Sequence, residues 1–106
     1  MKSYIEKEYQ ETDGLPFGLA IEAAKLGKKI ARAGWNGKNM FVYLVNGCTL
    51  EKQLLRGEAA EALRDVLKPD VKIHSHLDMK APDGSITVGW NASQRDMLAD
   101  DWFIVE

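Results

Sequence analysis

The chain has 106 residues, of which 45% are hydrophobic and 28% are charged, and its formal net charge is −2. These values are typical of one small globular domain and argue against a duplex-binding protein, whose affinity comes from an excess of basic residues. One local basic cluster contains Lys28, Lys29, Arg32 and Lys38. A small anion therefore fits the charge pattern better than DNA or RNA does.

The cysteine and hydropathy patterns bear on the cellular compartment. Cys48 is the single cysteine, which excludes an intrachain disulfide and fits a reducing cytoplasm. No apolar run matches a signal peptide, and none is long enough to cross a bilayer. We therefore expect a cytoplasmic protein without a membrane partner.

The chain begins with a polar segment, residues 1–14, which we expect to form a loose arm ahead of a single domain over residues 15–106. A helix is predicted from about Pro16 to Leu26, because apolar residues recur there at helical spacing and proline suits a first helical position. Gly27 follows at the place where a helix commonly ends in a left-handed cap.

Two strands are predicted next, over residues 28–35 and 40–46. The Asn36-Gly37 pair lies between them and predicts a tight hairpin turn, because both residue types tolerate positive φ. The second strand is apolar on both faces. Such a strand is expected to be covered on both sides, by helices or by another subunit.

The middle of the chain predicts a second helix over residues 57–67, with Pro69 beyond its end. Its inner face is expected to carry Ala59, Ala60, Leu63 and Val66 or Leu67. Residues 71–80 alternate between apolar and polar side chains, which predicts one strand with Leu77 and Met79 on the apolar face. The polar face of that strand would carry Lys72, His74, His76, Asp78 and Lys80.

The C-terminal part predicts a strand over residues 86–90, a short helix over 94–101 and a last strand over 102–105. The first of these strands is expected to place Ile86, Val88 and Trp90 on one face. Ser93 and Asp96 resemble a capping box at the start of the helix. The elements together predict an α+β domain in the order α-β-β-α-β-β-α-β, with a mainly antiparallel sheet.

One tripeptide occurs twice, as Gly34-Trp35-Asn36 and as Gly89-Trp90-Asn91. Each tryptophan alone is well explained as a hydrophobic plug at a strand end. The pair also suits a binding site, because an indole at the rim of a sheet can stack on a flat heterocycle for about 1–3 kcal/mol per base. The neighbouring asparagine can read a base or ribose edge, and the glycine permits close approach of the backbone.

The segment after the second tripeptide suits an anion. A helix that opens at Ser93 presents the backbone N–H groups of Gln94, Arg95 and Asp96, which can hold a phosphate. The alternative is that Ser93 and Asp96 only cap each other's backbone. Arg95 in the first turn opposes the helix dipole by about 0.3–1 kcal/mol, and an anionic ligand would compensate it.

A search for catalytic chemistry finds little. His74, His76 and Asp78 alternate along the predicted strand, and their side chains suit a metal in ligand type. A solvent-exposed polar face is the better explanation, because the sequence has no further histidine and only one cysteine to complete a ligand set. No nucleophile elbow and no glycine-rich phosphate loop are found. We therefore expect no enzyme, no metal and no cofactor.

Two stretches carry a resemblance to a known family. The first is "LPFGLAIEAAKLGKKIARAGWNGKNMFVYLV", and the second is "W-x-x-S-Q-x-D-M-L-A-x-D-W" near the C-terminus. Together they resemble the bacteriophage Thoeris anti-defence proteins of the second type. The resemblance runs from Leu15 to the end of the chain, and residues 48–80 match least.

The resemblance implies a non-catalytic homo-oligomer, typically a tetramer, that sequesters a cyclic ADP-ribose-type immune signal in the host cytoplasm. Some relatives are also implied to bind cyclic oligonucleotides. The matched motifs give the candidate ligand-binding residues as Trp35, Asn36, Gly37, Trp90, Ser93, Gln94, Arg95 and Asp96. Arg95 replaces the small hydroxyl residue expected in the family. The two tryptophans would form opposing walls of a slot, with one wall from each of two subunits as one arrangement.

Two alternatives stay open at this point. One is a nucleotide hydrolase that uses His74, His76 and Asp78. The other is an oligomeric interaction module whose tryptophans are buried in a subunit interface and bind no ligand.

Overall fold

The computed structural model describes residues 12–106. The predicted arm therefore falls mostly outside the described residues. The described chain divides into two compact units, which are a sheet unit of residues 12–45 and 76–106 and a hairpin unit of residues 46–75. No helix in the described part of the chain is long and apolar enough to cross a membrane.

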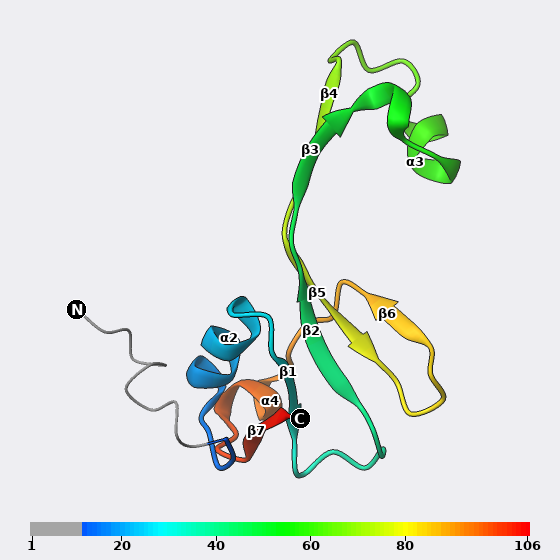
Figure 1. The fold of residues 1–106 in the computed structure, drawn as a ribbon. Coiled ribbons are helices and arrows are strands. Elements are labelled where there is room, and N and C mark those ends of the chain that lie inside the picture. The colour runs from blue at the N-terminus through cyan, green and yellow to red at the C-terminus, as the bar shows by residue number, and fades with distance from the viewer. Residues whose placement is uncertain (1–11) are drawn as a thin grey trace, which may run out of the picture. The chain divides into compact units, whose positions relative to one another are not determined.

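The described residues of the sheet unit form five strands and two helices (Figure 1). In chain order these are α2 (Phe17–Lys25), β1 (Lys29–Arg32), β2 (Phe41–Val45), β5 (His76–Lys80), β6 (Ile86–Val88), α4 (Gln94–Leu98) and β7 (Trp102–Val105). The strands make one antiparallel sheet in the order β6-β5-β2-β1-β7. The fold is therefore α+β with a mainly antiparallel sheet, as the sequence predicts.

The ends of α2 agree with the sequence signals. Pro16 directly precedes the helix, and its carbonyl accepts the N–H groups of Leu19 and Ala20. Gly27 has a φ of 90°, and its N–H donates to the carbonyl of Ala24 over 2.9 Å. A residue with a side chain is strained in this left-handed conformation, so glycine ends the helix here.

One face of the sheet is covered by α2, which lies against β1, β2 and β7 and contacts α4 (Figure 1). Ile30 stands opposite both Val42 and Ile104, so these three side chains share the covered face. The buried core contains Leu15, Leu19, Ala20, Ala23, Ala24, Ile30, Val42 and Trp102. Because three of the helical core residues are alanines, the helix can lie close to the sheet.

The opposite face of the sheet carries Phe41, Tyr43 and Val45, which are only half-buried. The register places the β6 residues Ile86 and Val88 on the same face, and these are 54% and 70% exposed. Within the described chain the helices therefore cover one face of β2. The predicted cover of its second face by another subunit stays a prediction.

The prediction of a tight turn at Asn36-Gly37 is wrong. Strands β1 and β2 do form an antiparallel pair, but residues 33–40 connect them as a longer loop. The left-handed residue of this loop is Asn39, with a φ of 62°. Gly37 is required for another reason, because a Cβ added there would lie 2.4 Å from Cγ of Pro82.

The prediction of a single strand over residues 71–80 is also wrong. The segment forms β4 (Asp70–Ile73) in the hairpin unit and β5 in the sheet unit, with a break at residues 74–75. Strand β3 (Cys48–Glu51), which the sequence did not predict, pairs with β4. The break is set by Gly47, whose N–H donates to Ser75 Oγ over 2.9 Å and whose added Cβ would lie 2.1 Å from the Ile73 carbonyl.

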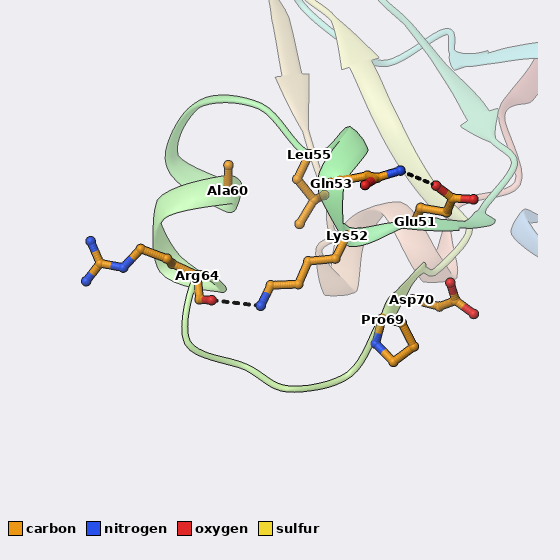
Figure 2. A pocket seen from close by; sticks show the side chains of 8 residues that line it. All are labelled: Glu51, Lys52, Gln53, Leu55, Ala60, Arg64, Pro69 and Asp70. Atoms are coloured by element: carbon orange, nitrogen blue, oxygen red, sulfur yellow. Dashed lines mark hydrogen bonds between the residues drawn. The ribbon is translucent and has the colours of Figure 1, made fainter.

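The helix predicted over residues 57–67 is shorter than expected, because α3 spans Gly57–Ala62. Its predicted inner face is wrong, since no residue of α3 is buried and Leu67 is 98% exposed. The 3-10 helix η1 (Lys52–Leu54) and α3 border a hollow of about 640 Å³ (Figure 2). The Lys52 ammonium points across this hollow and donates to the carbonyls of Arg64, over 2.8 Å, and Val66. These two bonds tie η1 to the segment after α3, and neither helix has a buried residue.

Candidate functional site

The three tryptophans of the chain form one cluster in the sheet unit. The Trp102 ring is fully buried. Its centroid lies 5.4 Å from the centroid of the Trp35 ring and 6.3 Å from that of the Trp90 ring. The rings of Trp35 and Trp90 meet edge to face, with centroids 6.1 Å apart and an angle of 75°. This geometry leaves no room for a flat heterocycle between them. Within one chain, the expectation that the two rings are opposing walls of a slot is therefore wrong.

The two glycines that precede Trp35 and Trp90 have different roles. A Cβ added at Gly34 would lie 2.8 Å from Asp101 Oδ2, so glycine is needed there for close approach. Gly89 has a φ of 80°, which turns the chain after β6. Trp90 then packs against the core, and its N–H donates to the Leu77 carbonyl over 2.7 Å. The prediction that Trp90 shares a face with Ile86 and Val88 is therefore wrong.

The predicted capping box is confirmed. Ser93 Oγ accepts the N–H of Asp96, and Asp96 Oδ2 accepts the N–H of Ser93, each over 3.1 Å. The helix α4 ends at Leu98 rather than at residue 101. The second oxygen of the buried Asp96, Oδ1, accepts Arg32 Nη1 over 2.8 Å and Trp35 Nε1 over 3.1 Å. Both carboxylate oxygens are thus engaged inside the protein.

Asp101 holds the same arginine from the other side. Its Oδ1 accepts Arg32 Nε over 2.8 Å, and its Oδ2 accepts the N–H of Gly34 over 2.8 Å. Asp101 is therefore engaged inside the protein, whereas the adjacent Asp100 is exposed. The predicted basic cluster is weakened as well, because two carboxylates offset the charge of Arg32.

The ionisation of these groups follows from their contacts. The hydrogen bond from Arg32 lowers the pKa of Asp101, against a smaller effect of burial. Burial acts to raise the pKa of Asp96, but the hydrogen bonds from Arg32, Trp35 and Ser93 outweigh it, so this pKa is also lowered. The hydrogen bonds to Asp101 and then Asp96 raise the pKa of Arg32. All three groups are therefore charged at neutral pH.

Acid is expected to destabilise the protein through these two carboxylates. Their folded-state pKa values lie below the ordinary 3.8. The stabilisation that they contribute is therefore complete above about pH 5 and is lost as the pH falls through the lowered values. Urea unfolding between about pH 7 and pH 3 measures this loss. The Asp101→Asn variant should show a weaker pH dependence, and an unchanged dependence would contradict the assignment of Asp101.

A hollow of about 440 Å³ opens beside Trp35 and extends from the 33–40 loop along β1 and β7 to Lys29 and Val105. Its aromatic lining comes from Trp35, Phe41 and Phe103, while Lys29 adds a cationic group and Glu106 an acidic one. Arg32 also borders the hollow, but its charge is offset by Asp96 and Asp101. Backbone and polar groups of the loop, including Gly37 and Asn39, complete one side. An aromatic wall beside the Lys29 ammonium suits a small anion that contains a flat ring.

The structure places the predicted site residues in two groups. Trp35, Trp90, Ser93 and Asp96 are joined by the ring contacts and hydrogen bonds described above. The others lie at the surface, with Asn36 and Gly37 in the 33–40 loop and Gln94 and Arg95 at the start of α4. Within residues 12–106, Arg95 makes no ion pair that would offset its charge at the start of α4. Ligand contact by these residues stays a prediction.

The predicted alignment of His74, His76 and Asp78 on one strand is wrong, because the strand break separates His74 from β5. Asp78 lies on the same face as Tyr43 and Val88, but its own side chain is buried: it is 6% exposed and accepts the N–H of Gly89 over 3.1 Å. His76 Nε2 lies 3.5 Å from Asp78 Oδ1. The part of the chain that the structure describes holds no group of three or more side chains suited to a metal ion.

The chain is similar to proteins of a known family. Residues 15–105 match the model of the Thoeris anti-defense 2-like domain. The chain belongs to the Thoeris anti-defense 2-like family. A relative, the protein Thoeris anti-defense 2 of Bacillus phage SP01, is 35% identical over 91 residues, which are 86% of this chain and 94% of that protein. The resemblance seen in the sequence is thus confirmed.

The Thoeris anti-defense 2-like domain includes three residues that sequence reasoning missed: Arg32, Asp101 and Trp102. In the sequence, Arg32 is one of several basic residues, and Trp102 is part of a predicted strand. The one signal available was the second family motif, which ends in Asp101-Trp102. The bonds from Arg32 to Asp96 and Asp101, and from Gly34 to Asp101, join segments more than 60 positions apart. The Trp102 bond to the Asp96 carbonyl spans 6 positions.

Proposed function

We propose that this protein is a phage anti-defence protein that binds a cyclic ADP-ribose-type immune signal, glyco-cyclic ADP-ribose, and sequesters it without cleavage in the host cytoplasm. The observation that carries the proposal is the membership of the Thoeris anti-defense 2-like family, together with the 35% identity to Thoeris anti-defense 2 of Bacillus phage SP01. Cyclic oligonucleotides are a second ligand class in this proposal. Sequestration needs affinity alone, so it requires no catalytic residue, metal or cofactor.

The hollow beside Trp35 supports the ligand class. An adenine ring can stack on an aromatic side chain, and a diphosphate can be attracted by a neighbouring cation such as Lys29. The hollow is bounded by strands and by a loop whose first residues are hydrogen-bonded. A preformed site binds more tightly than one that must be ordered first.

The uncovered sheet face supports a homo-oligomer, for which the family resemblance implies a tetramer. Apolar side chains of β2 and β6 lie on this face, and Phe103 of β7 lies there too, because it stands opposite Ala31. A second subunit would remove this surface from water. It would also add a wall to the hollow beside Trp35, which lies at the same face. The ligand would then lie in a slot between two subunits, and not between the Trp35 and Trp90 rings of one chain.

Calorimetric titration with glyco-cyclic ADP-ribose tests the proposal. The protein should bind the ligand, and heating the complex should release it intact. Trp35→Ala is expected to weaken binding about tenfold or more, because stacking on one aromatic ring contributes about 1–3 kcal/mol. Trp35→Phe keeps an aromatic ring but loses the indole N–H bond to Asp96 Oδ1, so it should weaken binding less than Trp35→Ala does.

Two results would contradict sequestration. Recovery of a cleaved nucleotide would favour a hydrolase, and loss of the cleavage in His76→Ala would assign it to that histidine. An absence of binding, with Trp35→Ala or Trp90→Ala changing the oligomer size in light scattering, would favour an interaction module without a ligand.

A further inference from the structure

We propose that Arg32, Asp96 and Asp101 act together as positioning residues, which we name the carboxylate clamp, and that they hold the 33–40 loop in its ligand-binding shape. The inference rests on the proposed function, because it concerns the same hollow. It assigns Asp96 a role inside the protein instead of a contact with the ligand.

The clamp joins three separate segments of the sheet unit. Arg32 is the last residue of β1, Asp96 lies in α4, and Asp101 directly precedes β7. The guanidinium donates through Nη1 to Asp96 and through Nε to Asp101, both over 2.8 Å. The side chain of Arg32 is only 17% exposed, so water screens these ion pairs less than it screens a surface pair.

Three backbone N–H groups at the start of the loop donate to residues of the clamp, one of them to a carboxylate and two to main-chain carbonyls. Ala33 donates to the Asp101 carbonyl over 3.0 Å, Gly34 donates to Asp101 Oδ2, and Trp35 donates to the Arg32 carbonyl over 3.2 Å. The Trp35 indole N–H then donates to Asp96 Oδ1. The clamp therefore sets both the path of the backbone and the direction of the indole ring.

The far end of the loop is held separately. Asn39 has a φ of 62°, and its carbonyl accepts Lys80 Nζ over 3.0 Å. Loss of the clamp is thus expected to loosen residues 33–37 while the connection to β2 remains. These loosened residues include Trp35 and Gly37, which line the hollow.

Charge and geometry argue that the clamp positions the loop and does not bind the ligand. One guanidinium faces two carboxylates, so the formal charge of the clamp is −1. A site with this charge does not attract a phosphate. Asp96 is 9% exposed, its Oδ1 has two donors and its Oδ2 has one. A ligand hydroxyl therefore finds little free acceptor capacity on this side chain.

Asp101→Asn tests the inference, and Asp100→Asn is the matched control. Both changes remove one negative charge from adjacent positions, but only Asp101 bonds Arg32 and Gly34. Without ligand, Asp101→Asn should speed amide hydrogen exchange in residues 33–37 about tenfold, as expected for loss of a charged hydrogen bond. Exchange in α2 should stay unchanged. The affinity for glyco-cyclic ADP-ribose should fall about tenfold as well, and Asp100→Asn should change neither quantity.

The outcomes separate the clamp from the proposed function. Equal loop exchange in Asp101→Asn and Asp100→Asn would overturn the clamp, whatever the ligand result. Faster loop exchange with full affinity would overturn its positioning role. Equally faster exchange in α2 and the loop would show a general structural role and overturn the inference.

If the unmodified protein binds no ligand, the proposed function fails, whereas the exchange comparison still decides whether the clamp orders the loop. Arg32→Lys, which keeps the charge but cannot bridge both carboxylates, gives the same comparison if Asp101→Asn does not fold.

Discussion

Replacing Trp102 with alanine is expected to lower the free energy of unfolding by about 3–5 kcal/mol, which is the largest stability effect that we expect from one substitution. Trp102 is fully buried, and its ring contacts those of Phe17, Trp35 and Trp90. Its indole N–H donates to the carbonyl of Asp96 over 2.9 Å, which ties β7 to α4. Urea unfolding followed by far-UV circular dichroism measures the change.

The Trp102→Phe variant separates the ring from its hydrogen bond. It keeps an aromatic side chain in the core but leaves the Asp96 carbonyl without the indole donor. We expect an intermediate loss of about 1–3 kcal/mol, from the lost bond and the space vacated by the smaller ring. A loss below about 1 kcal/mol in Trp102→Ala would show that the cluster is not the centre of the core.

The second large effect is expected for Asp96→Ala, which should lower the free energy of unfolding by about 3 kcal/mol. The change removes the acceptor for Arg32 Nη1, for the Trp35 indole N–H and for the Ser93 N–H. It thus breaks a largely buried ion pair and half of a capping box at once. The two losses share one side chain, so they are measured as a single difference in urea unfolding.

Asp100→Ala is the control for this prediction. Asp100 is exposed and lies in the same segment, so its removal should change the free energy of unfolding by less than about 0.5 kcal/mol. A similar loss in both variants would mean that the effect arises from the charge of the segment and not from the bonds of Asp96. Asp96→Asn should lie between the two, because the amide keeps one oxygen acceptor.

Much of the fold was predictable because its signals are local. The helix from Phe17 to Lys25 follows from its apolar spacing, with Pro16 and Gly27 marking its ends. The capping box at Ser93 needs only residues that lie three positions apart. Strands β1, β2 and β7 have compositions typical of a half-buried sheet. The family, too, was evident from two stretches of the sequence.

Other features were not predictable, since they depend on what a segment meets in space. The alternation of residues 71–80 continues through a break that is made by contact with Gly47. Asn36-Gly37 has the composition of a tight turn, yet the loop is held by Asp101 and Asp96 instead. Trp90 leaves the face of its strand because Gly89 adopts a positive φ, which a periodicity argument does not detect.

The amino-acid sequence alone determined the α+β class, most of the elements and the family, because backbone preference and hydrophobic periodicity act within a few residues. The tertiary structure decided which polar groups are used inside the protein. The sequence predicts Asp96 as a capping residue and gives Asp101 no role, but folding places both beside Arg32 at the start of the 33–40 loop. A charged side chain is drawn inward only where several donors converge on it, and that convergence is made by segments distant in the chain.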